Sequence, residues 1–260
     1  DNIGGYALVN EIASGGMGTV WRAKHPNLDR AVAIKVIRSE GTPGPQMREA
    51  FAREAKHLSR LHSPQILQIT DYGVTELGSP FIVTEYLEGE DLGARLRREG
   101  PQPYPAVARW AIEILKALAE AHSLGMVHRD LQPGNIFIQT LSGGAQEAVK
   151  VLDFGLAKLI GDELTMEDTL WPNARVKGSP IYMSPEQIQG DKVSSATDHY
   201  ALGATLYHLL TGEWVFSGSR AEILEAHINR VPSDLQSHPQ IDNLPTEFSD
   251  IIMGCLAKAP

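Results

Sequence analysis

His128-Arg129-Asp130-Leu131-Gln132-Pro133-Gly134-Asn135, followed by Asp153-Phe154-Gly155, is the stretch that decides the fold. A carboxylate such as that of Asp130 can position and deprotonate a hydroxyl group. Asn135 and Asp153 carry the oxygen atoms that magnesium favours as ligands. Each of these residues alone says little. With this order and spacing, and together with the upstream segments described below, their occurrence by coincidence is improbable.

A glycine-rich segment lies far upstream, Ala13-Ser14-Gly15-Gly16-Met17-Gly18-Thr19-Val20. Glycines lack side chains, so backbone N–H groups can come close to phosphate oxygens. A glycine cluster is also the ordinary composition of a turn. The dinucleotide-binding fingerprint has to open a helix after a strand, whereas β-type residues continue here through Val20 and Trp21. The segment therefore favours a phosphate-covering loop between two strands.

Lys35 ends the alternating run Val32-Ala33-Ile34-Lys35, which puts it on the same strand face as Ala33. On its own, such a lysine reads as a solvated charge at a sheet edge. Glu54, however, belongs to a helical series of otherwise apolar residues, Met47, Phe51, Leu58 and Leu61, and so is predicted to face inward. An inward carboxylate needs a cation. We therefore expect Lys35 and Glu54 to pair.

The organisation of the chain changes near Glu88-Gly89. Before this point, short β-type runs alternate with turns and one helix, and they predict an antiparallel sheet over Tyr6–Val9, Thr19–Ala23, Ala31–Ile37, Ile66–Ile69 and Phe81–Val83. From Pro105 onward helices dominate. One amphipathic helix carries Val107, Trp110, Ile114, Leu118 and Ala121, and the segment Thr197–Leu210 is apolar nearly all round, which is typical of a buried helix.

Composition indicates a soluble enzyme of the cytoplasm. The 260 residues are 42% hydrophobic and 21% charged, which is ordinary for a protein with a sizeable core. The formal charge of -9 argues against binding of nucleic acid. The N-terminus lacks the plan of a signal peptide, and no apolar stretch reaches membrane-spanning length. Cys255 has no partner for an internal disulfide and is expected in a buried helix within a reducing compartment.

These motifs resemble those of the protein kinase superfamily, in the form found in bacterial eukaryotic-type (Hanks-type) Ser/Thr protein kinases. The match includes H-R-D-L-x-x-x-N, D-F-G and the segment Ser184-Pro185-Glu186. The resemblance implies a two-lobed α+β fold, with an antiparallel sheet and one helix in the N-lobe and a mainly helical C-lobe. Residues 1–260 would form one kinase domain truncated at its C-terminus. Residues 1–87 would be the N-lobe with the Gly-rich loop and a regulatory helix, and 88–260 the C-lobe with the catalytic and activation loops.

The resemblance also implies the chemistry, namely transfer of the γ-phosphoryl group of ATP to Ser or Thr hydroxyls of proteins, with Mg²⁺ or Mn²⁺. It assigns catalytic roles to Asp130, Lys35, Glu54, Gln132 and Asn135, and metal binding to Asn135 and Asp153. The ATP-binding residues that it implies are Ala13, Gly15, Gly16, Gly18, Val20, Ala33, Lys35, Thr84 as gatekeeper, Glu85, Leu87, Asp91 at the ribose, and Phe137.

Two supporting roles follow from the same resemblance. His128 is expected to pack in a structural column with Phe154, Leu58 and Ile69. Asp198 is expected to hold the backbone of the catalytic loop through hydrogen bonds. Family members usually continue past residue 260 to an arginine that pairs with the counterpart of Glu186, which is why the chain is expected to be an excised domain. Membrane tethering by segments outside it stays open.

The sequence departs from the family pattern at two positions. Gln132 stands where Ser/Thr kinases usually carry lysine, and Ala13 stands at the first glycine. Losing one charge-assisted contact costs roughly 1.5 to 3 kcal/mol, or about 10 to 100 fold in rate, so a slowed enzyme is expected. The alternative is a pseudokinase that acts as a nucleotide-responsive binding module. A kinase of small molecules is disfavoured because 178–186 resembles a protein-substrate docking loop.

The segment after Asp153 resembles an activation loop. Arg129 and Lys158 are placed to form a basic pocket for a phosphothreonine, and we expect autophosphorylation at Thr169 or Thr165. The expected partners are protein substrates with Ser or Thr acceptors, including a second copy of the chain in trans. No nucleic acid and no membrane contact is expected from this segment.

Overall fold

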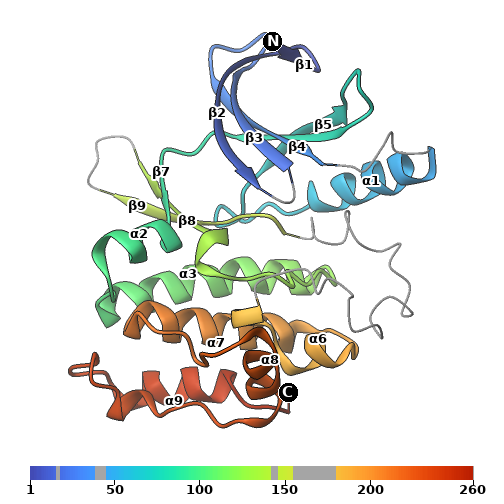
Figure 1. Ribbon diagram of the computed structural model, residues 1–260. Helices are drawn as coiled ribbons and strands as arrows, with labels where there is room; N and C mark the ends of the chain where they lie inside the picture. Colours follow the sequence, from blue (N-terminus) through green and yellow to red (C-terminus); the bar gives the residue numbers. More distant parts are fainter. Residues whose placement is uncertain (16–17, 39–44, 142–145, 155–179, 260) are drawn as a thin grey trace.

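The structure is a computed structural model that describes residues 1–260 apart from 16–17, 39–44, 142–145, 155–179 and 260. Its first part is a curled antiparallel sheet of six strands in the order β1-β2-β3-β4-β6-β5 (Figure 1). The strands are β1 (Asn2–Ile3), β2 (Tyr6–Gly15), β3 (Gly18–Lys24), β4 (Ala31–Ile37), β5 (Ile69–Val74) and β6 (Pro80–Glu85).

The strand predicted at 66–69 is wrong except for its last residue, because β5 begins at Ile69. The backbone of the preceding residues is used differently. Ile66 forms an isolated parallel bridge with Val151, and the Leu67 N–H donates to the Val151 carbonyl at 3.0 Å. An apolar run predicts burial well, but it does not say which strand its backbone will pair with. Here the partner belongs to the segment that leads to Asp153.

Helix α1 (Pro45–Leu58) packs against β5 and β6. Phe51, Ala55 and Leu58 are buried on its inner face. Leu61 lies three residues past the helix end and is buried as well, so the helical series continues into the following turn. The side chains of Met47 and Glu54 lie outside the part of the structure that is described.

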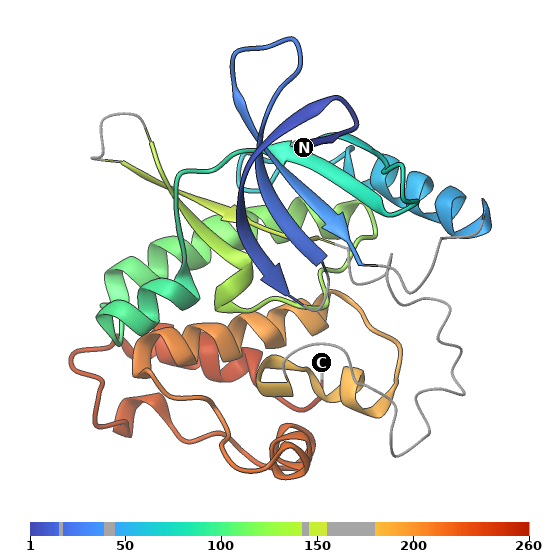
Figure 2. The ribbon, with the colours of Figure 1, turned by 45° about the horizontal axis from the view of Figure 1, so that its top comes forward.

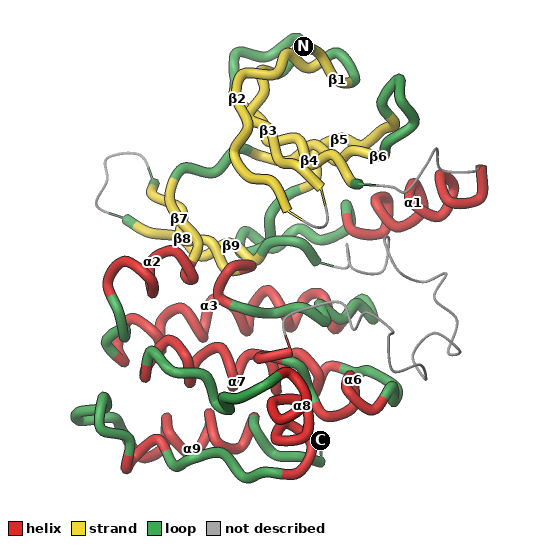
Figure 3. The backbone as a smooth tube through the Cα atoms, viewed as in Figure 1, coloured by secondary structure: helices red, strands yellow, loops and turns green. Residues whose placement is uncertain are grey.

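The second part is mainly helical, as predicted, with a small sheet of three strands at its upper edge (Figure 3). The small sheet contains β7 (Gly89–Asp91), β8 (Ile136–Thr140) and β9 (Glu147–Val151). The helices are α2 (Leu92–Glu99), α3 (Tyr104–Ser123), α6 (Pro185–Gln189), α7 (Ser195–Thr211), α8 (Arg220–Asn229) and α9 (Thr246–Cys255), with 3₁₀ turns η1 (Pro133–Asn135), η2 (Pro180–Tyr182) and η3 (Leu235–Ser237). The two-lobed α+β architecture is therefore confirmed.

The core of the helical part follows from its sequence pattern. All five apolar residues predicted to share one face of α3 are buried, and α3 packs on α7 (Figure 2). Helix α7 begins with a capping box, in which Ser194 and Thr197 bond to each other's backbone N–H groups. Its residues are buried nearly all round, as predicted, and it packs in turn on α9. None of the described helices has the length and apolar character needed to cross a membrane.

Cys255 is the last residue of α9 and is half-buried, which is less than the full burial predicted. Burial raises the pKa of its thiol above the usual value.

Gly18 illustrates a glycine that the fold itself requires. Its φ of 143° lies in a region that side chains rarely adopt, and a Cβ there would lie 2.0 Å from the Val36 carbonyl oxygen. We expect Gly18→Ala to lower the free energy of unfolding by about 1 to 3 kcal/mol. Gly15→Ala is the matched control, since a Cβ at Gly15 meets no atom within 4 Å. Equal denaturation midpoints for the two variants would contradict this reading.

Candidate active site

A cavity of about 380 Å³ lies between the six-stranded sheet and the helical lobe. Residues of both parts line it. Of the residues predicted to bind the cofactor, it is lined by Ala13, Val20, Ala33, Lys35, Thr84, Glu85, Leu87, Asp91 and Phe137. Gly15 and Gly18 are not among its lining residues; Gly18 borders a second cavity with Trp21 and Val36. Gly16 lies outside the described residues.

Strand alternation explains which side chains reach the cavity. Ala33 and Lys35 of β4 are two residues apart, and both point into it, as the alternation predicts. Val20 of β3 is opposite Lys35 in the sheet register, and Thr84 of β6 is opposite Ala33. Phe137 of β8 comes from the helical lobe. The cavity thus has apolar walls from two lobes, with one lysine between them.

Asp130 is held by two neutral amides. Gln132 Nε2 donates to Asp130 Oδ1 at 3.0 Å, and Asn135 Nδ2 donates to Oδ2 at 3.2 Å and to the Asp130 carbonyl at 2.7 Å. Burial raises the pKa of the Asp130 carboxyl above its usual value, and these two hydrogen bonds oppose the rise. A carboxylate in this setting is fixed in orientation and is a stronger base than an exposed one.

Lys35 and Asp153 form a direct ion pair, with Nζ 2.5 Å from Oδ2. Their side chains are only 16% and 28% exposed, so the reading of Lys35 as a solvated edge charge is wrong. The predicted partner Glu54 has its backbone in α1, but its side chain lies outside the described part. The pairing of Lys35 with Glu54 therefore stays a prediction.

The two predicted metal ligands fit a hard divalent cation. Asn135 uses its amide nitrogen in the hydrogen bonds to Asp130, so its side-chain oxygen Oδ1 can act as a ligand to a metal ion. The Leu152 N–H donates to the Asn135 carbonyl at 2.9 Å, which brings the next residue, Asp153, and its carboxylate close to Asn135. Among the described residues no group of three or more His, Cys, Asp or Glu gathers elsewhere. Two protein oxygens, completed by phosphates and water, are what magnesium usually accepts.

The backbone around Asp130 is held from below by Asp198, which confirms the role predicted for it. The fully buried carboxylate accepts from the His128 N–H at 2.8 Å, from the Arg129 N–H at 2.9 Å and contacts His122 Nε2 at 2.7 Å. Arg129 has a φ of 67°, in the left-handed region where a side chain is strained. The Arg129 carbonyl is also bonded by Gln187 Nε2 at 2.7 Å. Several contacts thus impose a backbone shape that is unfavourable by itself.

His128 has a structural place, as predicted. Its ring lies 4.6 Å from the ring of Phe154, edge to face, and its Nε2 contacts the Leu152 carbonyl at 2.8 Å. Leu58 belongs to the same buried cluster, with Ile69 packed against it.

The sequence analysis missed an ion pair behind the cavity. Lys150 of β9 is buried, and its Nζ lies 2.6 Å from Glu85 Oε1 at the end of β6. The same carboxylate oxygen accepts from the Gln68 N–H at 3.2 Å. The pair connects the two lobes next to the cavity. Its one signal in the sequence is a lysine inside the otherwise apolar run Ala148–Leu152.

Several predicted residues lie outside the described ranges, namely Gly155, Lys158, Thr165, Thr169 and Gly178. Glu186 is described, and it accepts a hydrogen bond from Thr197 Oγ1 at 2.6 Å.

Comparison with known proteins agrees with this geometry. The protein kinase domain family matches residues 6–260. The serine/threonine-protein kinase pkn3 of Myxococcus xanthus is 37% identical over 256 residues, which cover 98% of this chain and 46% of that protein. Serine/threonine-protein kinase PknB of Mycobacterium leprae is 34% identical over 259 residues, covering 98% and 40%. The chain therefore spans less than half the length of these relatives.

A solved structure shows the same fold. The PknI kinase domain of Mycobacterium tuberculosis superposes with a TM-score of 0.73 at 24% identity, over 100% of this chain and 90% of that one.

Asp198 offers a test of how the catalytic loop is held. We expect Asp198→Asn to lower the free energy of unfolding by about 2 to 4 kcal/mol, because an amide N–H would face buried N–H donors. Asp250→Asn is the control at an exposed position of α9. Thermal denaturation checks both variants, and an unchanged midpoint for Asp198→Asn would contradict the assignment.

The Glu85 and Lys150 pair is tested by a double-mutant cycle with Glu85→Gln and Lys150→Met. We expect a coupling energy above about 1 kcal/mol, since each single change leaves a buried lysine or a partly buried glutamate without its counter-ion. The control cycle uses Lys116 and Glu113, which pair at 2.5 Å on the exposed side of α3. There the coupling should stay below about 0.5 kcal/mol. Equal coupling in both cycles would mean that the pair between the lobes is no stronger than a surface one.

Proposed function

Because the chain belongs to the protein kinase family, we propose that it transfers the γ-phosphoryl group of ATP to Ser or Thr hydroxyls of proteins. The observation that carries the proposal is the Asp130 carboxylate, held by Gln132 and Asn135 close to the cavity that Lys35 and Asp153 line. The relatives named as serine/threonine kinases support the choice of acceptor.

In this proposal ATP occupies the cavity between the lobes, residues 1–87 and 88–260. Val20 and Ala33 cover one face of the adenine and Phe137 the other. The backbone at Glu85 and Leu87 bonds to its edge, and Asp91 accepts from the ribose. The cavity volume of about 380 Å³ and its largely apolar walls support a flat aromatic ligand with a few polar contacts at its rim.

The chemical work falls to the polar end of the cavity. Asp130 orients the acceptor hydroxyl and takes its proton, a task supported by the raised pKa of its carboxyl. Lys35 contributes positive charge at the α- and β-phosphates. Asn135 and Asp153 would hold Mg²⁺ or Mn²⁺, which supplies charge neutralisation at the phosphates.

The ion pair between Lys35 and Asp153 provides a way in which activity could be regulated. In the proposed reaction Lys35 contacts the phosphates of ATP and Asp153 binds a metal ion. The ion pair between the two residues therefore has to open or lengthen. Glu54 on α1 is the proposed second partner of Lys35, and the position of α1 would then influence activity. Gly15, Gly16 and Gly18 would cover the phosphates from above.

The partners and the compartment complete the proposal. Substrates are proteins with Ser or Thr acceptors, including a second copy of the chain in trans, with Thr165 or Thr169 as the acceptor. The single cysteine, half-buried and with a raised pKa, suits a reducing compartment that contains ATP, the cytoplasm.

The proposal is tested by a radiolabelled ATP and magnesium assay with autophosphorylation and a general protein substrate as readouts. We expect Asp130→Asn to lower the rate by about 10² to 10⁴ fold, because it removes the base. We expect Gln132→Lys to raise it by about 10 to 100 fold, because a cation would reach the transferring group.

ATP-induced thermal stabilisation serves as the folding and binding control for both variants. Wild-type protein and Gln132→Lys that bind ATP yet transfer no phosphate would overturn the proposal and leave a nucleotide-binding module.

A further inference from the structure

Gly93 of α2 leaves room for an arginine beside the catalytic loop. A Cβ built on Gly93 of α2 would lie 3.3 Å from Arg97 Nη1 and 3.5 Å from the Gly134 N–H nitrogen of η1. The same position is 3.0 Å from Asp91 Oδ1. The guanidinium of Arg97 therefore lies at the contact between α2 and η1, beside Gly134 and Asp91, which both line the cavity. A side chain at Gly93 would compete for this space.

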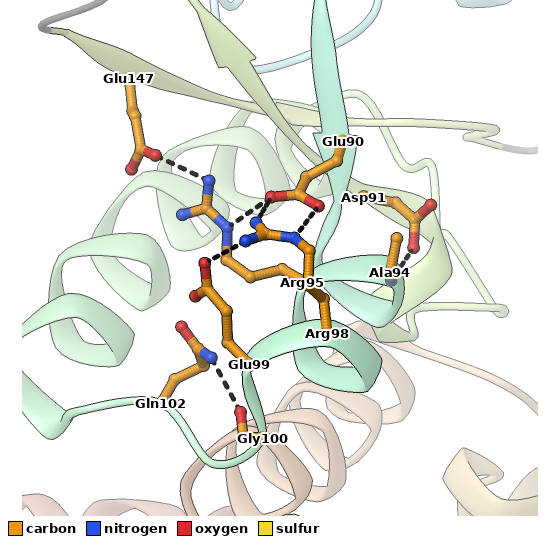
Figure 4. Close-up of polar contacts among 9 residues, drawn as sticks. All are labelled: Glu90, Asp91, Ala94, Arg95, Arg98, Glu99, Gly100, Gln102 and Glu147. Atoms are coloured by element: carbon orange, nitrogen blue, oxygen red, sulfur yellow. Dashed lines mark hydrogen bonds and ion pairs between the residues drawn. The ribbon is translucent and has the colours of Figure 1, made fainter.

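Arg97 differs from its two neighbours on the helix. Arg95 bonds to Glu90 at 3.1 Å and to Glu147 at 2.7 Å, and Arg98 bonds to Glu90 and to Glu99 (Figure 4). These contacts tie α2 to β7 and β9 on one side of the helix. Arg97 is exposed and has neither a hydrogen bond nor an ion pair to any other described residue. Its five N–H donors are available to a ligand.

The nearest carboxylate already has a structural bond. Asp91 Oδ1 accepts from the Ala94 N–H at 2.8 Å and so caps the start of α2 (Figure 4). The chain as a whole carries a net charge of -9, and the exposed guanidinium of Arg97 is a positive group beside two residues that line the cavity. An anion approaching this rim meets a planar donor group that matches carboxylates and phosphates.

The distance between the proposed base Asp130 and the loop residue next to Arg97 is short. Gly134 follows Asp130 by four residues, so the two lie at most roughly 14 Å apart even if the loop were extended. A protein substrate whose hydroxyl contacts Asp130 would therefore have residues within a few positions of that hydroxyl that can reach Arg97. The nucleotide is the less suitable anion, because Arg97 is not among the residues that line the cavity proposed to hold it.

Resting on the proposed function, we propose that Arg97 is a specificity-determining residue that binds an acidic group of the protein substrate a few residues from the phosphorylated hydroxyl. The acidic group is a carboxylate of Asp or Glu, or the phosphate of a residue phosphorylated earlier. Both present the paired oxygens that a guanidinium binds.

The test uses synthetic peptides with one threonine in a neutral background. Glu, phosphoserine or Lys is placed singly at each of the three positions on either side. We expect the wild type to have a higher kcat/KM for Glu or phosphoserine than for Lys at one or more positions. Arg97→Ala should reduce that preference by about three- to tenfold, and Arg97→Glu should reverse it. Preference for phosphoserine alone would assign the site to substrates phosphorylated beforehand.

Arg98→Ala is the matched control, because Arg98 is the adjacent exposed arginine and is bound to Glu90 and Glu99. It should keep the wild-type preference. An unchanged preference in Arg97→Ala would overturn the inference, as would a raised KM for ATP with an unchanged preference, which would place Arg97 at the nucleotide. Absence of phosphate transfer to every peptide and to the protein itself would instead refute the proposed function.

Discussion

The buried carboxylate of Asp198 is the constraint on which the catalytic loop depends. It holds two consecutive N–H groups, those of His128 and Arg129, and the second belongs to a residue with a left-handed backbone. A non-glycine residue in that region costs of order 1 to 3 kcal/mol and persists only where surrounding contacts impose it. Helix α7 provides the base, since its first turn begins with a capping box and buries Thr197 and Asp198. The backbone that leads into Asp130 is thus held by a residue 68 positions later in the chain.

How far the sequence predicts the structure depends on whether a pattern is local. Alternation in β4 correctly put Ala33 and Lys35 on one face, and the stripe of α3 predicted its buried residues, because both depend only on neighbours within one element. The strand expected at 66–69 was wrong because the partner of that backbone, Val151, is remote. The Glu85 and Lys150 pair was missed for the same reason, since it joins residues 65 apart. Most of the predicted cofactor-binding residues do line the cavity, because they were assigned through the family resemblance, which already includes such remote pairings.

The two charged residues Lys35 and Asp153 pair with each other at the cavity, and each is also the proposed partner of a ligand. Lys35 and Asp153 neutralise each other at 2.5 Å in a partly buried place, where an unpaired charge would be costly. In the proposed complex, phosphates would pair with Lys35 and a divalent cation would pair with Asp153. Binding of both together would therefore offset the free-energy cost of separating the two side chains. A single ligand of one sign leaves the other residue uncompensated. If Lys35 and Asp153 have the roles proposed above, the ion pair would make the binding of nucleotide and of metal mutually dependent.

In the proposed reaction, Gln132 would affect two quantities that change the rate in opposite directions, namely the basicity of Asp130 and the positive charge near the transferred phosphoryl group. A lysine at this position would attract negative charge, stabilise the transferring group and also stabilise the ionised form of Asp130, which weakens it as a base. The neutral amide of Gln132 keeps the hydrogen bond to Asp130 Oδ1 and omits the charge, so burial can hold the pKa of that carboxyl above its usual value. With Gln132, the Asp130 carboxylate would be the stronger base, but the transferred phosphoryl group would lack the positive charge that a lysine provides. Because phosphoryl transfer depends mainly on positioning and charge, we expect the loss to outweigh the gain, so that Gln132 would slow the proposed transfer without removing the proposed base.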